Sequence, residues 1–260
     1  MKGKAALIGH TGFIGSFLKS SGGYTHFYNS TNIGDIGDEQ FDVVVCAGTS
    51  AVKWQANAEP ERDRQGILRL QENLARLRAG QFVLVSTVDV FQTPLHVNEN
   101  TPVNPEGLHP YGLHRYGLEV FVREHFQRSC VVRLPAMFGP GLKKNALYDL
   151  LHDNNIDKIP MNASFQWYNL RHLPHDLPRM ADLPLVHMAT EPVAMHAIVD
   201  RFFPDKSGRG HTGKAANYDM QTIYAERFGG QGSYIADAET ILAELGTFVR
   251  EERERLQGKG

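Results

Sequence analysis

The chain has 260 residues, of which 42% are hydrophobic and 22% are charged, and its formal net charge is −2. This length can bury the core of one large α/β domain, or of a nucleotide-binding domain that carries a smaller part. The near-neutral charge gives no basic surface for a phosphate backbone, which argues against a nucleic acid as partner.

The sequence also argues against a membrane protein. No apolar run approaches the roughly 18 residues that a membrane span needs, and the N-terminus leads directly into a short strand instead of a signal-peptide core. We therefore expect a cytoplasmic protein. The two cysteines, Cys46 and Cys130, lie in apolar runs typical of buried strands, so we expect free core thiols and no disulfide.

Four short apolar runs in the first third of the chain predict strands that are buried on both faces, because each is nearly continuous in hydrophobicity. They are Ala5 to Ile8, Thr25 to Tyr28, Val43 to Cys46 and Phe82 to Val85. Helices are predicted from Phe13 to Leu18 and along an apolar stripe from Ile67 to Leu77 that ends at Gly80. Alternating strands and helices imply right-handed crossovers and a parallel sheet.

The link from Asn29 to Gln40 is short and rich in Gly, Asn and Asp, so we expect a loop or a single turn there. Further along, Tyr111 to Phe126 is a predicted helix and Cys130 to Leu134 a predicted strand. The regular pattern continues as far as Gly141. Residues 1–141 are therefore expected to form the first domain.

Residues 142–260 are divided by prolines into short pieces and are expected to form a reduced second region. Within it, a strand near Leu185 to Met188 is expected to return to the main sheet. The apolar stripe from Ile241 to Val249 predicts a final amphipathic helix, followed by a frayed tail from Glu251 to Gly260.

A glycine-rich loop follows the first predicted strand and opens the first helix. The spacing of Gly9, Gly12 and Gly15 lets the backbone turn tightly and lets a pyrophosphate approach the helix N-terminus. The strand-turn-helix context favours a bound dinucleotide over an unliganded glycine turn. The loop residues that we expect to contact the dinucleotide are Gly9, Thr11, Gly12, Phe13, Ile14 and Gly15.

The choice between NAD and NADP usually depends on the end of the second strand, where an acid bonds the ribose hydroxyls or an arginine accepts the 2′-phosphate. This position is occupied here by Asn29 and Ser30, with neither an acid nor an arginine. The choice therefore stays open. We lean towards NADP because no acid is present to repel a 2′-phosphate.

Two later segments carry chemistry. The segment from Ser86 to Phe91, Ser-Thr-Val-Asp-Val-Phe, follows the fourth strand, and Pro110 to Glu119, Pro-Tyr-Gly-Leu-His-Arg-Tyr-Gly-Leu-Glu, opens the next helix. Together with the GxxGxxG loop, they resemble the extended branch of the short-chain dehydrogenase/reductase superfamily, which acts on nucleotide sugars. Thr87 adds a likeness to the dTDP-4-dehydrorhamnose reductase type. The resemblance implies a Rossmann-like, doubly wound parallel sheet with a small C-terminal substrate-binding region.

The resemblance also implies catalytic and cofactor-binding roles for individual residues. Tyr111 corresponds to the family's acid/base and Thr87 to the hydroxyl that orients the substrate oxygen. The positions expected to contact the cofactor include the Ala-Gly turn after the third strand and the segment beside the nicotinamide. They are Asn29, Ser30, Ala47, Gly48, Ser86, Tyr111, Arg115 and Pro135.

Arg115 is the main departure from the family's pattern. A free tyrosine has a pKa of about 10, and the family lowers it with a lysine four residues after the tyrosine. An arginine keeps the charge, but its planar fork does not reproduce a compact ammonium that bonds the ribose hydroxyls. Three interpretations follow: Arg115 replaces the lysine in a working enzyme, the redox chemistry is weakened or lost, or the site is reshaped for another substrate.

The sequence thus predicts an NAD(P)-dependent epimerase, dehydratase or reductase that acts on a sugar nucleotide or a related carbonyl or hydroxyl compound. The alternative is a non-catalytic dinucleotide-binding protein, a sensor or assembly partner that has lost the Tyr-Lys pair. Resemblance alone suggests a homodimer through the helix that carries Tyr111. We expect no metal site, because His172 and His175 lack a third ligand at a recognisable spacing.

Overall fold

The structure, a computed structural model, describes residues 3–213 and 215–258. Within these ranges the chain divides into two compact units. The first comprises the described residues of Met1–Thr93, Glu99–Leu134 and Leu173–His187, and the second those of Pro94–Asn98, Pro135–His172 and Met188–Gly260. The chain therefore enters the second unit three times and returns to the first unit twice.

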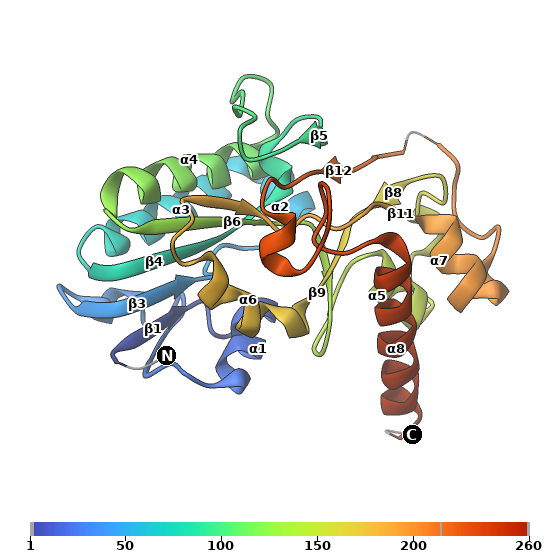
Figure 1. Cartoon of the computed structure of the whole chain (residues 1–260), viewed down its shortest axis with the longest axis horizontal. Coiled ribbons are helices and arrows are strands. Elements are labelled where there is room, and N and C mark those ends of the chain that lie inside the picture. Colours follow the sequence, from blue (N-terminus) through green and yellow to red (C-terminus); the bar gives the residue numbers. More distant parts are fainter. Residues whose placement is uncertain (1–2, 214, 259–260) are drawn as a thin grey trace. The chain divides into compact units, whose positions relative to one another are not determined.

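A six-stranded sheet forms the centre of the first unit, in the order β10-β6-β4-β3-β1-β2, and every neighbouring pair is parallel (Figure 1). Its strands are β1 (Ala5–Ile8), β2 (His26–Tyr28), β3 (Gln40–Cys46), β4 (Arg78–Thr87), β6 (Ser129–Leu134) and β10 (Leu185–His187). The expected α/β fold with a parallel sheet is confirmed. The last strand, β10, returns late in the sequence and pairs with β6 at one edge of the sheet.

One face of this sheet carries the main hydrophobic core. Successive side chains of a strand point to opposite faces, and alternate residues of the central strands, Val44, Cys46, Phe82 and Leu84, belong to one buried cluster. Their partners lie on α3 (Pro60–Leu74) and α4 (Pro110–His125), and include Ile67, Leu70, Leu74, Leu118 and Val122. A short helix, α2 (Lys53–Ala58), precedes α3 and contacts both longer helices.

The other face of the sheet is covered by α1 (Phe13–Ser21) and α6 (Leu173–Met180), which contact each other. The link between β2 and β3 holds only the 3-10 turn η1 (Ile33–Ile36), as its length predicts. Both isoleucines of this turn pack into the core of the α3 and α4 face. The opposite face therefore has only two short helices as cover.

The second unit is built from helices α5 (Ala146–His152), α7 (Met195–Phe202) and α8 (Ala238–Gln257) around a second hydrophobic cluster. Three two-stranded pairs complete it: β5 (Leu95–Val97) with β12 (Asp219–Met220), β7 (Ala136–Phe138) with β9 (Trp167–Asn169), and β8 (Ser164–Phe165) with β11 (Val193–Ala194). Short 3-10 turns lie between these elements, at η3 (Ile156–Lys158), η4 (Leu170–His172), η5 (Pro204–Lys206) and η6 (Ala225–Phe228).

Two predicted element ends are wrong. The helix expected to end at Gly80 ends at Leu74, and Gly80 lies inside β4, where a Cβ would come within 2.9 Å of the Asp42 carbonyl of the neighbouring strand. Of the tail expected to fray from Glu251 to Gly260, residues 251–257 are helical, and residues 259–260 lie outside the described residues. Two ion pairs, Arg171 with Glu251 and Arg255 with Glu252, support this end of α8.

Both cysteines are buried thiols outside any disulfide, as predicted from their apolar surroundings. In the part of the chain that the structure describes, no helix combines the length and the apolar character needed to cross a membrane.

Candidate active site

The glycine loop lies between β1 and α1, and its three glycines differ in what they require. Gly9 has a φ of +85°, and a Cβ there would come within 2.3 Å of the Ala47 carbonyl oxygen. A Cβ on Gly15 would come within 2.0 Å of the Gly9 carbonyl oxygen, so both positions need glycine for packing. At Gly12 the nearest atom would be 3.4 Å away, an ordinary contact. The fold itself therefore tolerates a Cβ at Gly12.

Gly12 lies at the start of α1. Gly12 is the N-cap residue, and among the described residues no side chain caps the helix. Thr11 and Gly12 are exposed, Phe13 and Ile14 are half-buried, and Gly15 is buried. An uncapped helix N-terminus presents backbone N–H groups and the positive end of the helix dipole to an anion. The residues present fit the pyrophosphate of a dinucleotide.

The loops after β2 and β3 lie at the same edge of the sheet, because β3, β1 and β2 are adjacent and parallel. After β2, the side-chain oxygen of Asn29 accepts hydrogen bonds from the backbone N–H and the hydroxyl of Thr31, at 2.9 and 2.6 Å, and Ser30 is exposed. After β3, Ala47 is half-buried and Gly48 is exposed. The expected adenosine positions thus form one open edge without an acidic side chain at the end of β2.

Thr87 and Tyr111 are brought together by a close approach of α4 to the end of β4. Thr87 is the last residue of β4, and Tyr111 is the second residue of α4. A Cβ on Gly112 would come within 2.1 Å of the Asp89 carbonyl oxygen, so glycine at this position permits the approach. The side chain of Asn57 on α2 accepts the Tyr111 backbone N–H at 3.0 Å and fixes the start of α4.

The surroundings of the Tyr111 phenol favour its protonated form. The pKa of Tyr111 is raised, first by burial of its side chain and then by the carboxylates of Asp89 and Asp63, whereas Arg115 and a hydrogen bond with Thr87 lower it. The side chain is only 8% exposed. The neutral phenol is therefore the form that this site holds.

Arg115 occupies the place expected for the family's lysine, but its guanidinium is committed to protein acceptors. Nη1 and Nη2 donate to the two carboxylate oxygens of Asp63 at 2.6 and 2.9 Å, and also to the carbonyls of Tyr111 and Ser50 at 3.1 and 2.6 Å. The guanidinium lies 3.8 Å from the centre of the Tyr111 ring. The same Asp63 carboxylate contacts His114 Nδ1 at 2.7 Å.

This arrangement bears on the expected ribose contact. Among the described residues, the buried Nε of Arg115 is its one N–H without a hydrogen-bond partner. Arg115 therefore acts on Tyr111 through the face of the ring, as a cation stacked on an aromatic group. A contact with the ribose hydroxyls stays a prediction, and it would have to use Nε or break an existing bond.

Lys53 is a second cation at this edge that sequence reasoning missed. It is the first residue of α2, and its Nζ lies 2.7 Å from Asp89 Oδ1. Its positive charge also helps to lower the pKa of His109, although burial is the larger cause. Only its position five residues after Gly48 of the Ala-Gly turn could have indicated it, and that position alone does not indicate a chemical role.

A buried ionic layer lies beneath the site. Ser86 donates its hydroxyl to Glu119 Oε1 at 2.5 Å, and Arg133 contacts both oxygens of the same carboxylate, most closely at 2.6 Å. Arg133 Nη1 lies 3.2 Å from His187 Nε2, and its guanidinium stacks on Phe91. The predicted cofactor contact at Ser86 is not tested, but the hydroxyl is engaged with this layer. We infer that the layer fixes the end of β4 that carries Thr87.

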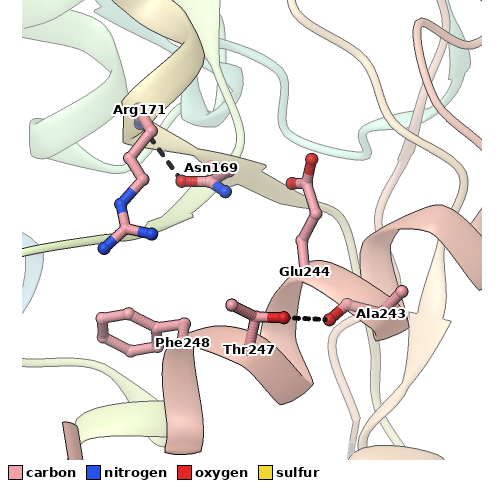
Figure 2. A pocket seen from close by; sticks show the side chains of 6 residues that line it. All are labelled: Asn169, Arg171, Ala243, Glu244, Thr247 and Phe248. Atoms are coloured by element: carbon pink, nitrogen blue, oxygen red, sulfur yellow. Dashed lines mark hydrogen bonds between the residues drawn. The ribbon is translucent and has the colours of Figure 1, made fainter. Parts of the chain in front are cut away.

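In the second unit, a pocket of about 230 Å³ lies between η4 and α8 (Figure 2). It is lined by Asn169, Arg171, Ala243, Glu244, Thr247 and Phe248. The guanidinium of Arg171 is paired with Glu251 at 2.6 Å, and His172 contacts Glu244 at 2.6 Å, so both side chains already face a neighbouring carboxylate. Pro135 is the first residue of this unit after β6. In the described ranges, no cluster of three His, Cys, Asp or Glu side chains is placed to hold a metal ion.

Comparison with known proteins shows which enzymes share this fold. No protein-family model matches the sequence, and no curated protein matches it. Among solved structures, UDP-glucose 4-epimerase from Thermotoga maritima with UDP-glucose has a TM-score of 0.74 at 16% identity, covering 97% of this chain and 99% of that one. MoeE5 in complex with UDP-glucose and NAD has a TM-score of 0.74 at 15% identity, covering 98% and 100%.

A reductase is similar to the same extent. The dTDP-4-dehydrorhamnose reductase from Bacillus anthracis in complex with NADP has a TM-score of 0.71 at 14% identity, covering 96% of this chain and 99% of that one. The chain therefore has the fold of NAD(P)-dependent epimerases and reductases of nucleotide sugars. This confirms the fold expected from the motif resemblance.

Proposed function

We propose that this chain binds a nicotinamide dinucleotide, NAD or NADP, and catalyses a redox step on a nucleotide sugar or a related carbonyl compound, with reduction as the favoured direction. One observation carries the proposal. The Thr87-Tyr111 hydroxyl pair lies at the carboxyl edge of the sheet that also carries the open glycine loop. In sheets of this kind, ligands bind outside the carboxyl ends of the strands.

The protonation state of Tyr111 supports reduction. When bound, a reduced nicotinamide supplies a hydride to the carbonyl carbon of the substrate. The carbonyl π electrons then move to the oxygen, which takes the proton of the Tyr111 phenol, while Thr87 orients this oxygen. The phenolate recovers its proton from solvent. Burial keeps the phenol protonated at neutral pH, as donation of this proton requires, whereas an epimerase or a dehydratase would first need a phenolate as base.

Arg115 supports this direction through its partner. Its charge faces the Tyr111 ring, and the Asp63 carboxylate at hydrogen-bond distance offsets part of it. A cation whose charge is partly offset stabilises a phenolate less than a free ammonium does. Of the three interpretations of Arg115, we therefore favour a working enzyme in which arginine replaces lysine with a changed role.

A second candidate is a dinucleotide-binding protein without catalysis. The four hydrogen bonds of the Arg115 guanidinium favour it, because they consist entirely of contacts to protein and give no direct hold on the ribose. In this case the glycine loop would still bind the cofactor, and Tyr111 would serve to pack Arg115.

Cofactor binding and turnover separate the two candidates. Titration with NADPH and NADH, followed by cofactor fluorescence, measures binding, and the oxidation of NADPH with a nucleotide-linked 4-keto sugar measures turnover. Tyr111→Phe is expected to abolish turnover and to leave cofactor affinity nearly unchanged. Tyr116→Phe on the same helix is the matched control. Wild-type protein that binds NADPH without turnover on any tested sugar nucleotide supports the second candidate.

Arg115→Lys refines this comparison. An unchanged or higher rate supports the usual chemistry of the superfamily, since lysine restores its residue at this position. Lost cofactor affinity shows that Arg115 makes cofactor contacts of its own. The turnover rate and the cofactor affinity of Arg115→Lys are interpreted only if this variant unfolds cooperatively at a temperature close to that of the wild type.

Three further parts of the proposal concern the cofactor, the second region and assembly. The absence of an acid at Asn29 and Ser30 predicts that NADPH binds at least as tightly as NADH.

We also propose that residues 1–141 hold the cofactor and that residues 142–260 hold the substrate, with Pro135 beside the nicotinamide. A cytoplasmic location and a homodimer complete the proposal, and light scattering tests the dimer.

A further inference from the structure

The face of the main sheet that α1 and α6 cover contains a cavity of about 410 Å³. Its apolar lining comes from alternate residues of β3 and β4 and from the two helices, and includes Val43, Val45, Val83, Leu18 and Leu177. It shares no lining residue with the glycine loop or with Thr87 and Tyr111. The cavity is therefore separate from the proposed active site.

The short helices explain why this face is incompletely packed. α1 has nine residues and α6 has eight, with Pro178 inside α6. The end of α1, the turn that follows it and both prolines of α6 border the cavity. A longer helix at either place would cover these strands, so the hollow follows from the sequence of the two helices.

Two polar side chains in the cavity wall have no partner among the described residues. Gln81 on β4 is 7% exposed, and both its amide nitrogen and its amide oxygen lack a hydrogen bond. The buried hydroxyl of Tyr24 also lacks one, and burial raises its pKa above the ordinary value. Buried polar groups in proteins are nearly always hydrogen-bonded, because an unmet bond costs stability. These two groups therefore indicate something polar on the cavity side.

We propose that this cavity binds a small neutral molecule with an apolar body and one group that both donates and accepts hydrogen bonds, such as a carboxamide or an alcohol. A carboxamide would accept from Gln81 Nε2 and donate to Gln81 Oε1, while the Tyr24 hydroxyl supplies a further bond. None of the described residues that line the cavity has a charged side chain, so an ionised ligand would be buried without a counter-charge. The volume lies within the roughly 300–1,000 Å³ of ligand pockets.

An adjoining cavity of about 350 Å³ has Gln81 and Ala181 in its wall as well. It differs in chemistry, because Arg123, Arg128 and Asp182 line it. A ligand that contacts Gln81 could approach from either side. The test must therefore show which of the two cavities binds the ligand, by means of variants at residues that line only one of them.

The probes are cyclohexanecarboxamide, cyclohexanol and methylcyclohexane, titrated into the full-length protein and followed by thermal shift and by the NMR signal of the Gln81 side-chain amide. We expect saturable binding of the first two and weaker binding of the hydrocarbon. Gln81→Leu keeps the size of the side chain, removes its polar atoms, and is expected to raise the Kd about tenfold through the lost hydrogen bonds. Val43→Phe fills the apolar cavity and is expected to abolish binding.

Gln65→Leu, an exposed glutamine on α3, is the matched control and should bind as the wild type does. Tyr24→Phe, which removes the other polar group of the cavity wall, replaces Gln81→Leu in the test if that variant does not fold. The proposal is overturned if the wild type binds none of the probes, or if Val43→Phe binds them unchanged. It is equally overturned if Arg128→Gln weakens binding while Gln81→Leu does not, since the ligand would then occupy the adjoining cavity.

Discussion

Arg115 on α4 and Asp63 on α3 form a buried, bidentate ion pair, with N···O distances of 2.6 and 2.9 Å. The arginine side chain is 2% exposed and the aspartate side chain 7%. This pair replaces the free cation that the family resemblance leads one to expect beside Tyr111. It also joins the helix that carries the phenol to its neighbour, so one contact serves both stability and the electrostatics of the site.

Removing the carboxylate of Asp63 should lower the stability of the protein. Asp63→Asn leaves the Arg115 guanidinium buried without its counter-charge, and we expect a loss of about 3 kcal/mol in the free energy of unfolding, the usual cost of breaking a buried pair. Urea denaturation measures it. Glu61→Gln on the same helix, where the carboxylate is exposed and pairs with Arg64, should leave the midpoint nearly unchanged. Equal losses in the two variants would contradict a special role for Asp63.

The glycine loop offers a separation of folding from binding. Gly12→Val adds a side chain where the protein leaves room, so the variant should fold and lose NADPH binding because the side chain fills the anion position. Gly15→Val places a Cβ within 2.0 Å of the Gly9 carbonyl oxygen and should lower the thermal midpoint strongly. Circular dichroism and NADPH titration check both. A Gly12→Val protein with normal NADPH affinity would remove the loop from the binding site.

The pKa of Tyr111 sets the pH dependence of reduction. Reduction needs the protonated phenol, and burial raises its pKa, so kcat/KM should stay level through neutral pH and fall only above the ordinary tyrosine pKa of about 10. Asp89→Asn removes a negative charge that raises this pKa and should move the alkaline limb to lower pH. Asp35→Asn, on η1, is the control. A limb that moves to higher pH in Asp89→Asn would contradict the assigned electrostatics.

The buried ionic layer under the site gives a further prediction. Glu119→Leu leaves Arg133 buried without a carboxylate, and we expect a loss of about 3 kcal/mol or more in the free energy of unfolding. Glu124→Leu, an exposed position on the same helix, should have little effect. Because Ser86 is held by the same carboxylate, cofactor affinity is expected to fall with Glu119→Leu even where the protein remains folded.

Much of the first unit could be predicted from the sequence. Continuous apolar runs locate the strands of a parallel sheet, and the carboxyl ends of such strands lie at one edge, which places the loop at Gly12 at the same edge as Thr87. The helix that carries Tyr111 follows from Pro110 at its start, whereas the role of Tyr111 comes from the family resemblance and stays a prediction. The inferences about the fold succeed because they depend on local periodicity and on chain order.

The partners of Arg115 and the under-packed face could not be predicted. Asp63 lies 52 positions away on an amphipathic helix with several acids, and nothing in its local pattern distinguishes it from Glu61. The helix end predicted at Gly80 was wrong because glycine both ends helices and permits close contacts between strands. The missing partners of Gln81 depend on the lengths of two helices together, which no single segment reveals.

The central claim is that the Tyr111 phenol donates a proton to a carbonyl group while NADPH is oxidised. The most direct measurement is single-turnover oxidation of NADPH with a nucleotide-linked 4-keto sugar, compared between wild type, Tyr111→Phe and Tyr116→Phe. We predict a rate at least about 10²-fold lower in Tyr111→Phe, the usual contribution of general acid catalysis, and an unchanged rate in Tyr116→Phe. NADPH binding with equal turnover in wild type and Tyr111→Phe would contradict the claim.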